Sequence, residues 1–147
     1  MKHIRSYEKY INGGIEVYRG TRSSSKLYDG MFFTVDLEYA SMFGHNIEKY
    51  LIYPKKTLNL FEYNSIIREK LKDKEIYGLE NFLHMHAKAI ASGWDSWIDL
   101  LYNYGLEELA DKFENELEEC DSIYGADSGF DDSKVYYIKK KENVKKI

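Results

Sequence analysis

The residues whose types are best suited to ligand binding or catalysis form the run Arg19-Gly20-Thr21. This run follows an alternating apolar–polar segment over residues 15–18. This alternation predicts a β-strand that ends at the run. A guanidinium binds phosphate or ribose oxygens through forked hydrogen bonds, and a glycine lets a ligand approach the backbone closely. The run therefore indicates an anion-binding strand end, although an ordinary strand end with a surface arginine has the same sequence.

The histidines and the cysteine predict neither a metal centre nor a nucleophile. His84 and His86 stand two residues apart on a predicted helix, which puts them about 200° apart around its axis, so they cannot share a metal ion there. Cys120 has no basic neighbour in the sequence to favour its thiolate. The sequence also contains no glycine-rich loop of the dinucleotide or Walker type. We expect no metal site.

The elements that must position these residues fall into three groups. Alternation predicts opening strands over residues 15–18, 31–34, 47–53 and 57–61. Asp36 is the expected N-cap of a short helix over 37–43, and Gly44 is its expected stop.

The middle of the chain is predicted to be helical and its end to be β. Apolar residues at helical spacing predict helices over 66–72, 79–90, 94–101 and 106–117. Closing strands are expected over 122–124 and 135–138. Because strands and helices are segregated rather than alternating, the pattern favours an α+β fold in which the closing strands pair with the opening ones.

Composition limits the class of protein. The chain has 147 residues, 44% of them hydrophobic, which fits a single domain over residues 1–147. A net charge of −4 gives no global basic surface for direct nucleic-acid binding. One cysteine rules out an internal disulfide, and no stretch approaches the roughly 20 apolar residues of a membrane span. A cytoplasmic protein without membrane partners is the expectation.

Charge is unevenly distributed along the chain. Eight acidic residues lie between Glu107 and Asp121, against one basic residue, Lys112. The C-terminal end carries five lysines, at 139–141, 145 and 146. The acidic run is typical of a solvated helix face. The alternative is a face that docks on a basic partner, such as a nucleic-acid-binding protein, by imitating a phosphate track.

The segment from Gly30 to Gly44 adds a family resemblance. Together with the Arg19 run, it resembles the ADP-ribosyltransferase fold shared by bacterial toxins, poly-ADP-ribose polymerases and phage effectors. In that family two aromatic residues, eleven positions apart, clamp the nicotinamide ring of NAD. Phe32 and Phe43 have this separation. The polymerase-like branch usually has tyrosine at both positions, but phenylalanine keeps the stacking face.

The resemblance covers roughly residues 14–61 and implies a role for each matching residue. It implies that Arg19 and Thr21 hold the pyrophosphate or the adenosine ribose, and that Thr34 steadies the pocket. Further NAD-binding positions are Tyr18, Gly20 and Phe33. It also implies a split β-sheet core with a central helical insertion and NAD as substrate rather than as a resident cofactor.

The carboxylate that the family requires is not where it usually stands. A glutamate normally precedes the last apolar strand and stabilises the oxocarbenium-like transition state. Lys134 occupies that position here. A small phage anti-CRISPR branch of the fold, which the tail at 144–147 also resembles, uses instead an aspartate at the end of the preceding strand. Asp127 fits that position best, and Asp131 and Asp132 are the fallback candidates.

The sequence therefore predicts a mono-ADP-ribosyltransferase that transfers ADP-ribose from NAD to a protein target. An anti-CRISPR, phage or toxin-type inhibitor of a host defence protein fits this resemblance. Two alternatives stay open at this point. The chain could be an inactive nucleotide-binding or protein-interaction module, which Lys134 favours, or it could hydrolyse NAD with water as the acceptor.

Overall fold

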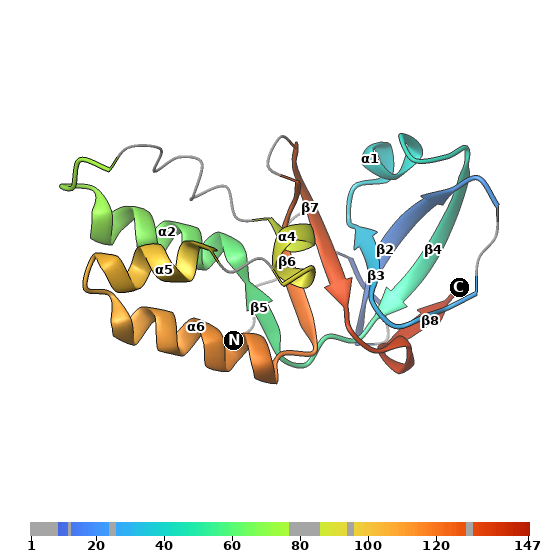
Figure 1. The fold of residues 1–147 in the computed structure, drawn as a ribbon. Helices are drawn as coiled ribbons and strands as arrows, with labels where there is room; N and C mark the ends of the chain where they lie inside the picture. The colour runs from blue at the N-terminus through green and yellow to red at the C-terminus, as the bar shows by residue number, and fades with distance from the viewer. Residues whose placement is uncertain (1–8, 12, 24–25, 77–85, 94–95, 129–130) are drawn as a thin grey trace.

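The computed structural model describes residues 9–11, 13–23, 26–76, 86–93, 96–128 and 131–147. The strands are β1 (Lys9–Ile11), β2 (Gly14–Thr21), β3 (Met31–Thr34), β4 (Asn46–Ile52), β5 (Thr57–Asn59), β6 (Ser122–Ser128), β7 (Asp131–Ile138) and β8 (Val144–Lys146). The helices are α1 (Leu37–Ser41), α2 (Leu60–Leu71), α4 (Ala87–Ala91), α5 (Ser96–Asn103) and α6 (Glu107–Glu119), with a short 3-10 turn over Lys141–Asn143. The predicted α+β class, with helices between two groups of strands, is confirmed (Figure 1).

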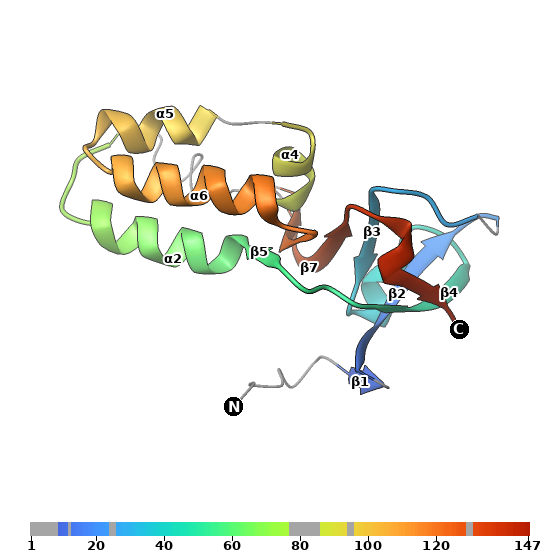
Figure 2. The same ribbon diagram turned by 90° about the horizontal axis from the view of Figure 1, so that it is seen from below.

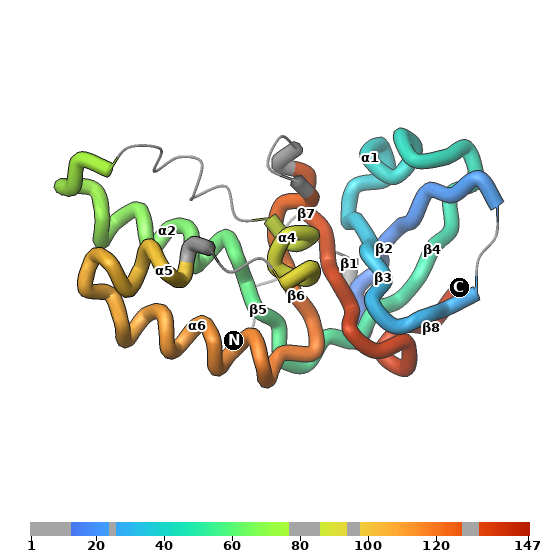
Figure 3. The backbone as a smooth tube through the Cα atoms, viewed as in Figure 1, coloured from blue at the N-terminus to red at the C-terminus, as the bar shows by residue number. Residues whose placement is uncertain are grey.

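All eight strands belong to one mixed sheet. Its order is β5-β6-β7-β3-β2-β4-β8, with β1 paired to β2. Only the β5–β6 pair is parallel among the described strands. The closing strands return to the opening ones as predicted, since β7 pairs with β3 and β8 pairs with β4. The tube in Figure 3 shows this return path.

A split β-sheet core was predicted, and the described strands form one continuous sheet that is weakly paired at one place. Over the described residues, β2 and β3 are registered through the single pair Tyr18–Thr34, whereas β2 and β4 pair over seven residues. The sheet is therefore continuous, but a single registered residue pair joins the β5-β6-β7-β3 half to the β2-β4-β8 half. Whether this core belongs to the ADP-ribosyltransferase family stays a prediction.

Alternating residues send side chains to opposite faces of the sheet, and each face has its own core. On β7, Val135 packs with the helices, while Tyr136 packs with Met31 and Tyr50 on the other face. α2, α5 and α6 gather beside β5 and β6, and α1 lies at the other half of the sheet (Figures 1 and 2). The buried Phe113 anchors α6 in the helical core. The aromatic-rich composition thus fills two cores.

Several predicted boundaries need correction. α2 begins at Leu60 rather than at residue 66, because the Asn59 side chain accepts hydrogen bonds from the backbone of Phe61 (3.0 Å) and Glu62 (3.2 Å). The predicted strand at 57–61 is correspondingly shorter. Most of the predicted helix over 79–90, including His84, and residues 94–95 of the next lie outside the described residues.

The acidic run lies on α6, where most of its carboxylates are exposed. Glu116 is an exception, because it accepts a hydrogen bond of 2.6 Å from the Tyr63 hydroxyl. That hydrogen bond helps to raise the pKa of Tyr63, after the larger effect of burial. Glu116 therefore has a structural contact, and the proposed partner-docking role of this face stays a prediction.

The backbones of β2 and α1 approach one another at a glycine. A Cβ added at Gly20 would lie 1.8 Å from the carbonyl oxygen of Ala40. The missing Cβ at Gly20 is therefore required for α1 to pack on β2, and close approach of a ligand to the Gly20 backbone stays a prediction. The same approach recurs at Gly44, whose added Cβ would lie 2.2 Å from the carbonyl oxygen of Thr21.

We expect Gly20→Ala to destabilise the fold by about 3 kcal/mol, because the methyl group forces α1 away from β2. Urea denaturation measures the change in the free energy of unfolding. Gly13→Ala is the control, since its Cβ would meet open space; we expect about 1 kcal/mol there, from its left-handed backbone. Equal losses in the two variants would contradict the close approach.

Candidate active site

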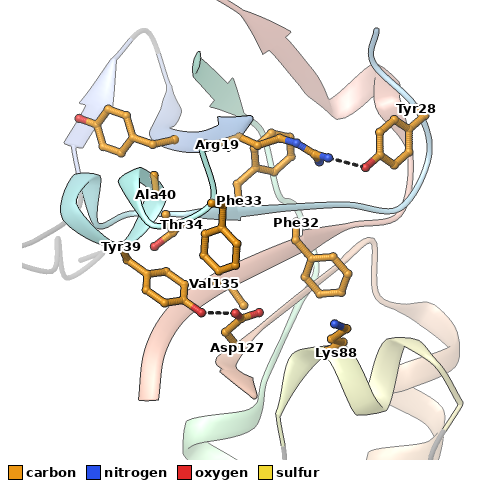
Figure 4. Close-up of a pocket in the computed structure, with 13 residues that line it drawn as sticks. Arg19, Tyr28, Phe32, Phe33, Thr34, Tyr39, Ala40, Lys88, Asp127 and Val135 are labelled. Atoms are coloured by element: carbon orange, nitrogen blue, oxygen red, sulfur yellow. Dashed lines mark hydrogen bonds between the residues drawn. The ribbon is translucent and has the colours of Figure 1, made fainter. Parts of the chain in front are cut away.

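A pocket of about 350 Å³ opens where the strand ends of both sheet halves meet α1 and α4 (Figure 4). Its walls come from β2, β3, β6 and β7, from the loop before β3, and from the two helices. The lining residues are Tyr18, Arg19, Gly20, Tyr28, Phe32, Phe33, Thr34, Tyr39, Ala40, Phe43, Lys88, Asp127 and Val135. The pocket thus combines aromatic rings with two cations and one carboxylate.

Thr34 fixes the strand end from which α1 departs. Its buried hydroxyl donates to the backbone carbonyl of Lys134 (3.0 Å) and accepts from the backbone N–H of Asp36 (3.1 Å). Asp36 then caps α1 by accepting from the backbone N–H groups of Glu38 (2.9 Å) and Tyr39 (3.3 Å). This chain of contacts joins β3 to β7 and starts the helix in a fixed direction. It places Tyr39 at the pocket.

Asp127 supplies the carboxylate of the pocket, near the end of β6. The pairing of Ala126 with Lys134 and of Ser128 with Asp131 shows that the register shifts around Asp127. Such a bulge changes the direction of a side chain at a sheet edge. In Figure 4 the Asp127 carboxylate points toward α1.

Two groups hold Asp127 in place. The Tyr39 hydroxyl donates a hydrogen bond to its carboxylate, and Tyr39 is itself buried. On the backbone side, His86 bridges to Ala126, the residue before Asp127, and so fixes this part of β6. A carboxylate with both its side chain and its backbone tethered is held for one orientation.

His86 connects this carboxylate to α4. It is the N-cap of the helix, and its Nδ1 accepts from the backbone N–H of Ala89 (3.2 Å). An accepting Nδ1 requires the neutral tautomer of the ring, which is protonated at Nε2. Burial lowers the pKa of His86 from 6.5, while the charge of Asp127 opposes the shift and that of Lys88 supports it. The ring is therefore kept neutral.

Arg19 is oriented by Tyr28 at another part of the pocket. The guanidinium donates a hydrogen bond of 2.7 Å to the Tyr28 hydroxyl and lies 5.3 Å from the centre of the Tyr28 ring. The hydroxyl of Tyr18, the residue before Arg19, donates a hydrogen bond of 2.9 Å to the Glu16 carboxylate. Burial raises the pKa of Tyr18 to about 12, and the hydrogen bond to Glu16 and the charge of Glu16 contribute to this rise. Tyr18 thus lines the pocket as an uncharged side chain, and Arg19 is a cation that Tyr28 holds in one orientation.

The two aromatic residues expected to clamp a ring both line the pocket. Phe32 packs edge-on against Tyr137, with ring centres 4.9 Å apart. Phe43 packs edge-on against Tyr39 at 5.0 Å and is 54% exposed. Phe43 therefore has an accessible ring face at the pocket. That the pair holds a nicotinamide ring stays a prediction.

The structure brings together eight of the predicted site residues: Tyr18, Arg19, Gly20, Phe32, Phe33, Thr34, Phe43 and Asp127. Thr21 is not among the described residues that line the pocket. Its hydroxyl is buried and finds no hydrogen-bond partner in the described part of the chain. The side chains of Asp131 and Asp132 lie outside the described residues.

Lys134, which stands at the family's glutamate position, is also not among the described lining residues. Its ammonium lies 5.9 Å from the centre of the Phe61 ring. Phe61 packs against the core that contains Tyr50 and Tyr136, on the face of the sheet opposite the helical core. Val135, the next residue on β7, faces the pocket instead. Strand alternation thus keeps this cation away from Asp127.

Sequence reasoning missed Tyr28, Tyr39, Ala40, Lys88 and Val135 as lining residues. A signal existed for Tyr39, because it lies four residues before Phe43 and so shares its side of the predicted helix. Lys88 had no signal, since nothing in the sequence brings residue 88 to residues 19–43.

The described residues contain no candidate metal site. No group of three or more His, Cys, Asp or Glu side chains there could hold a metal ion. No described helix is both long enough and apolar enough to cross a membrane.

Comparisons with known proteins give little similarity. No protein family model matches the chain, and no curated protein sequence matches it. A crystal structure of an anti-CRISPR protein is similar with a TM-score of 0.41 and 14% identity, over 92% of this chain and 97% of that one. A similarity this distant transfers neither fold nor activity. Membership of the ADP-ribosyltransferase family therefore stays a prediction from the sequence.

The neutral His86 makes stability depend on pH. Because its pKa is lower in the folded protein, the unfolded chain takes up the proton first as the pH falls below 6.5. The contribution of His86 is complete above that pH and is lost as the pH falls through the folded pKa. We expect wild-type unfolding free energy, measured in urea, to decline below pH 6.5.

His86→Asn keeps a neutral cap and should flatten this decline. The exposed His45 offers the matched variant His45→Asn, which should leave the decline unchanged. If His86→Asn follows the wild-type curve at every pH, His86 is not the group that titrates.

Proposed function

We propose that this chain is an ADP-ribosyltransferase that cleaves NAD in the Asp127 pocket and passes ADP-ribose to a protein acceptor. The observation that carries the proposal is the meeting of Asp127, Arg19, Phe32 and Phe43 at one pocket, although they come from four separate segments. A carboxylate, an aimed guanidinium and accessible aromatic rings are the groups that cleavage of a nicotinamide glycoside requires.

The reaction begins when the bond between C1′ of the ribose and the nicotinamide nitrogen lengthens. Nicotinamide leaves as a neutral molecule with the electron pair of that bond, and positive charge develops on the ribose. The Asp127 carboxylate stabilises this charge. The Tyr39 hydroxyl holds the Asp127 carboxylate, and the bridge from His86 to Ala126 holds the strand beside it, so that Asp127 need not reorient during the reaction.

The second half of the reaction forms the new bond. A nucleophile of the acceptor attacks C1′, and its proton passes to Asp127 or to solvent. Arg19 holds a phosphate of the dinucleotide, with its guanidinium already aimed by Tyr28. Phe32 and Phe43 offer stacking faces for nicotinamide. Thr34 acts through the backbone, because both its hydrogen bonds fix the β3 end.

The position of Lys134 bears on the inactive alternative. A cation beside the ribose would oppose the developing positive charge, and Lys134 favoured a module without catalysis for that reason. Its ammonium lies instead at Phe61, and the pocket keeps Asp127. This placement supports an active enzyme. Release of nicotinamide without labelled protein would select NAD hydrolysis, and binding without release would select the inactive module.

Asp127→Asn should lower the rate of nicotinamide release by about 10²–10⁴-fold, because it removes the charge that stabilises the transition state. The affinity for NAD should change little, since Asn keeps the size of the side chain. Chromatography of nicotinamide measures the rate, and calorimetry measures the affinity. Asp73→Asn, at an exposed position just after the C-terminal end of α2, should match wild type. Wild-type turnover by Asp127→Asn would refute the assignment.

Tyr39→Phe keeps the ring against Phe43 and removes only the hydrogen bond to Asp127. We expect nicotinamide release to slow by about 10-fold, the size of a hydrogen bond to a charged group. The control Tyr102→Phe removes the hydroxyl that donates to Asp111, at 2.7 Å and away from the pocket. Equal rates for both variants would show that the Tyr39 hydroxyl does not position Asp127.

A further inference from the structure

Lys88 reaches the pocket from α4, which is fixed on both sides. Ala87 and Ile90 are buried in the helical core, at 0% and 3% exposure. His86 caps the helix and bridges to Ala126 of β6. The base of the Lys88 side chain is therefore held against the sheet, although the side chain itself is exposed to the pocket.

The Lys88 side chain extends from α4 toward the Phe32 ring in Figure 4, and Asp127 lines the same pocket. Within the described part of the chain it has no hydrogen-bond or ion-pair partner. The carboxylate of Asp127 is instead bound by the Tyr39 hydroxyl. A cation in a concave site that does not pair with the neighbouring carboxylate is available to a ligand.

The charges of the pocket indicate which ligand group that is. Arg19 and Lys88 bring two positive charges, and Asp127 brings one negative charge, in a chain whose net charge is −4. A pocket with excess positive charge in an acidic protein favours an anion. Aromatic rings beside the two cations favour an anion attached to a ring system, which is the chemistry of a nucleotide phosphate.

We propose that Lys88 is a phosphate-binding residue that, with Arg19, selects ligands that carry a diphosphate. This inference rests on the proposed function for the identity of the ligand as a nucleotide. It assigns to α4, within the helical insertion, a direct role in substrate selection. Lys88 acts as a mobile point charge, and Arg19 acts as a fork oriented by Tyr28.

The test compares ADP with adenosine, which has the same base and ribose but no phosphate. Calorimetry with Lys88→Gln should show ADP affinity reduced by roughly 10- to 100-fold and adenosine affinity unchanged. Lys88→Arg should restore most of the ADP affinity, because it restores the charge. Lys70→Gln, an exposed helical lysine on α2, is the matched control and should bind both ligands as wild type does.

The inference is overturned if Lys88→Gln binds ADP as tightly as wild type, if it loses ADP and adenosine equally, or if wild type binds ADP no better than adenosine. Nicotinamide release from NAD separates this result from the proposed function. Turnover by wild type with unchanged ADP binding in Lys88→Gln removes only the inference. A specific loss of ADP binding, with no turnover by wild type, supports Lys88 and removes the transferase.

Discussion

The hydrogen bond from the Tyr39 hydroxyl to the Asp127 carboxylate joins segments that are 88 residues apart. Tyr39 belongs to α1, which packs on the β2 half of the sheet, and Asp127 belongs to β6, in the half that carries the helices. The two halves share one registered residue pair between β2 and β3. A contact across this narrow join therefore holds the pocket walls together, and the pocket depends on it.

Other contacts make that hydrogen bond possible. Thr34 and Asp36 fix where α1 starts, and Gly20 lets its backbone lie against β2. From the other side, the backbone bridge from His86 to Ala126 ties the start of α4 to β6, next to Asp127. The carboxylate is thus approached from both halves of the sheet. A site that rests on contacts between two halves can bind a ligand that spans them.

Sequence reasoning predicted the opening strands, the Asp36 cap and the return of the closing strands, because these follow from local alternation and capping. It also named Asp127, whose strand-end position is a local feature. Tyr39 and Lys88 were missed because their roles come from tertiary contacts that no local pattern encodes. Gly20 was singled out for access of a ligand, but the sequence could not show that the Ala40 carbonyl also requires a glycine there. The direction of the Lys134 side chain depends on strand alternation in β7, so the sequence alone did not show that its ammonium lies at Phe61.

In the proposed reaction NAD binds with its nicotinamide riboside end at Asp127. A crystal structure of the Asp127→Asn variant with NAD tests it most directly, because that variant should hold the uncleaved dinucleotide. We expect the nicotinamide ring between Phe32 and Phe43, the ribose beside residue 127, and a phosphate at Arg19. Dinucleotide bound at another surface, or an empty pocket at saturating NAD, would contradict the proposed mode of NAD binding.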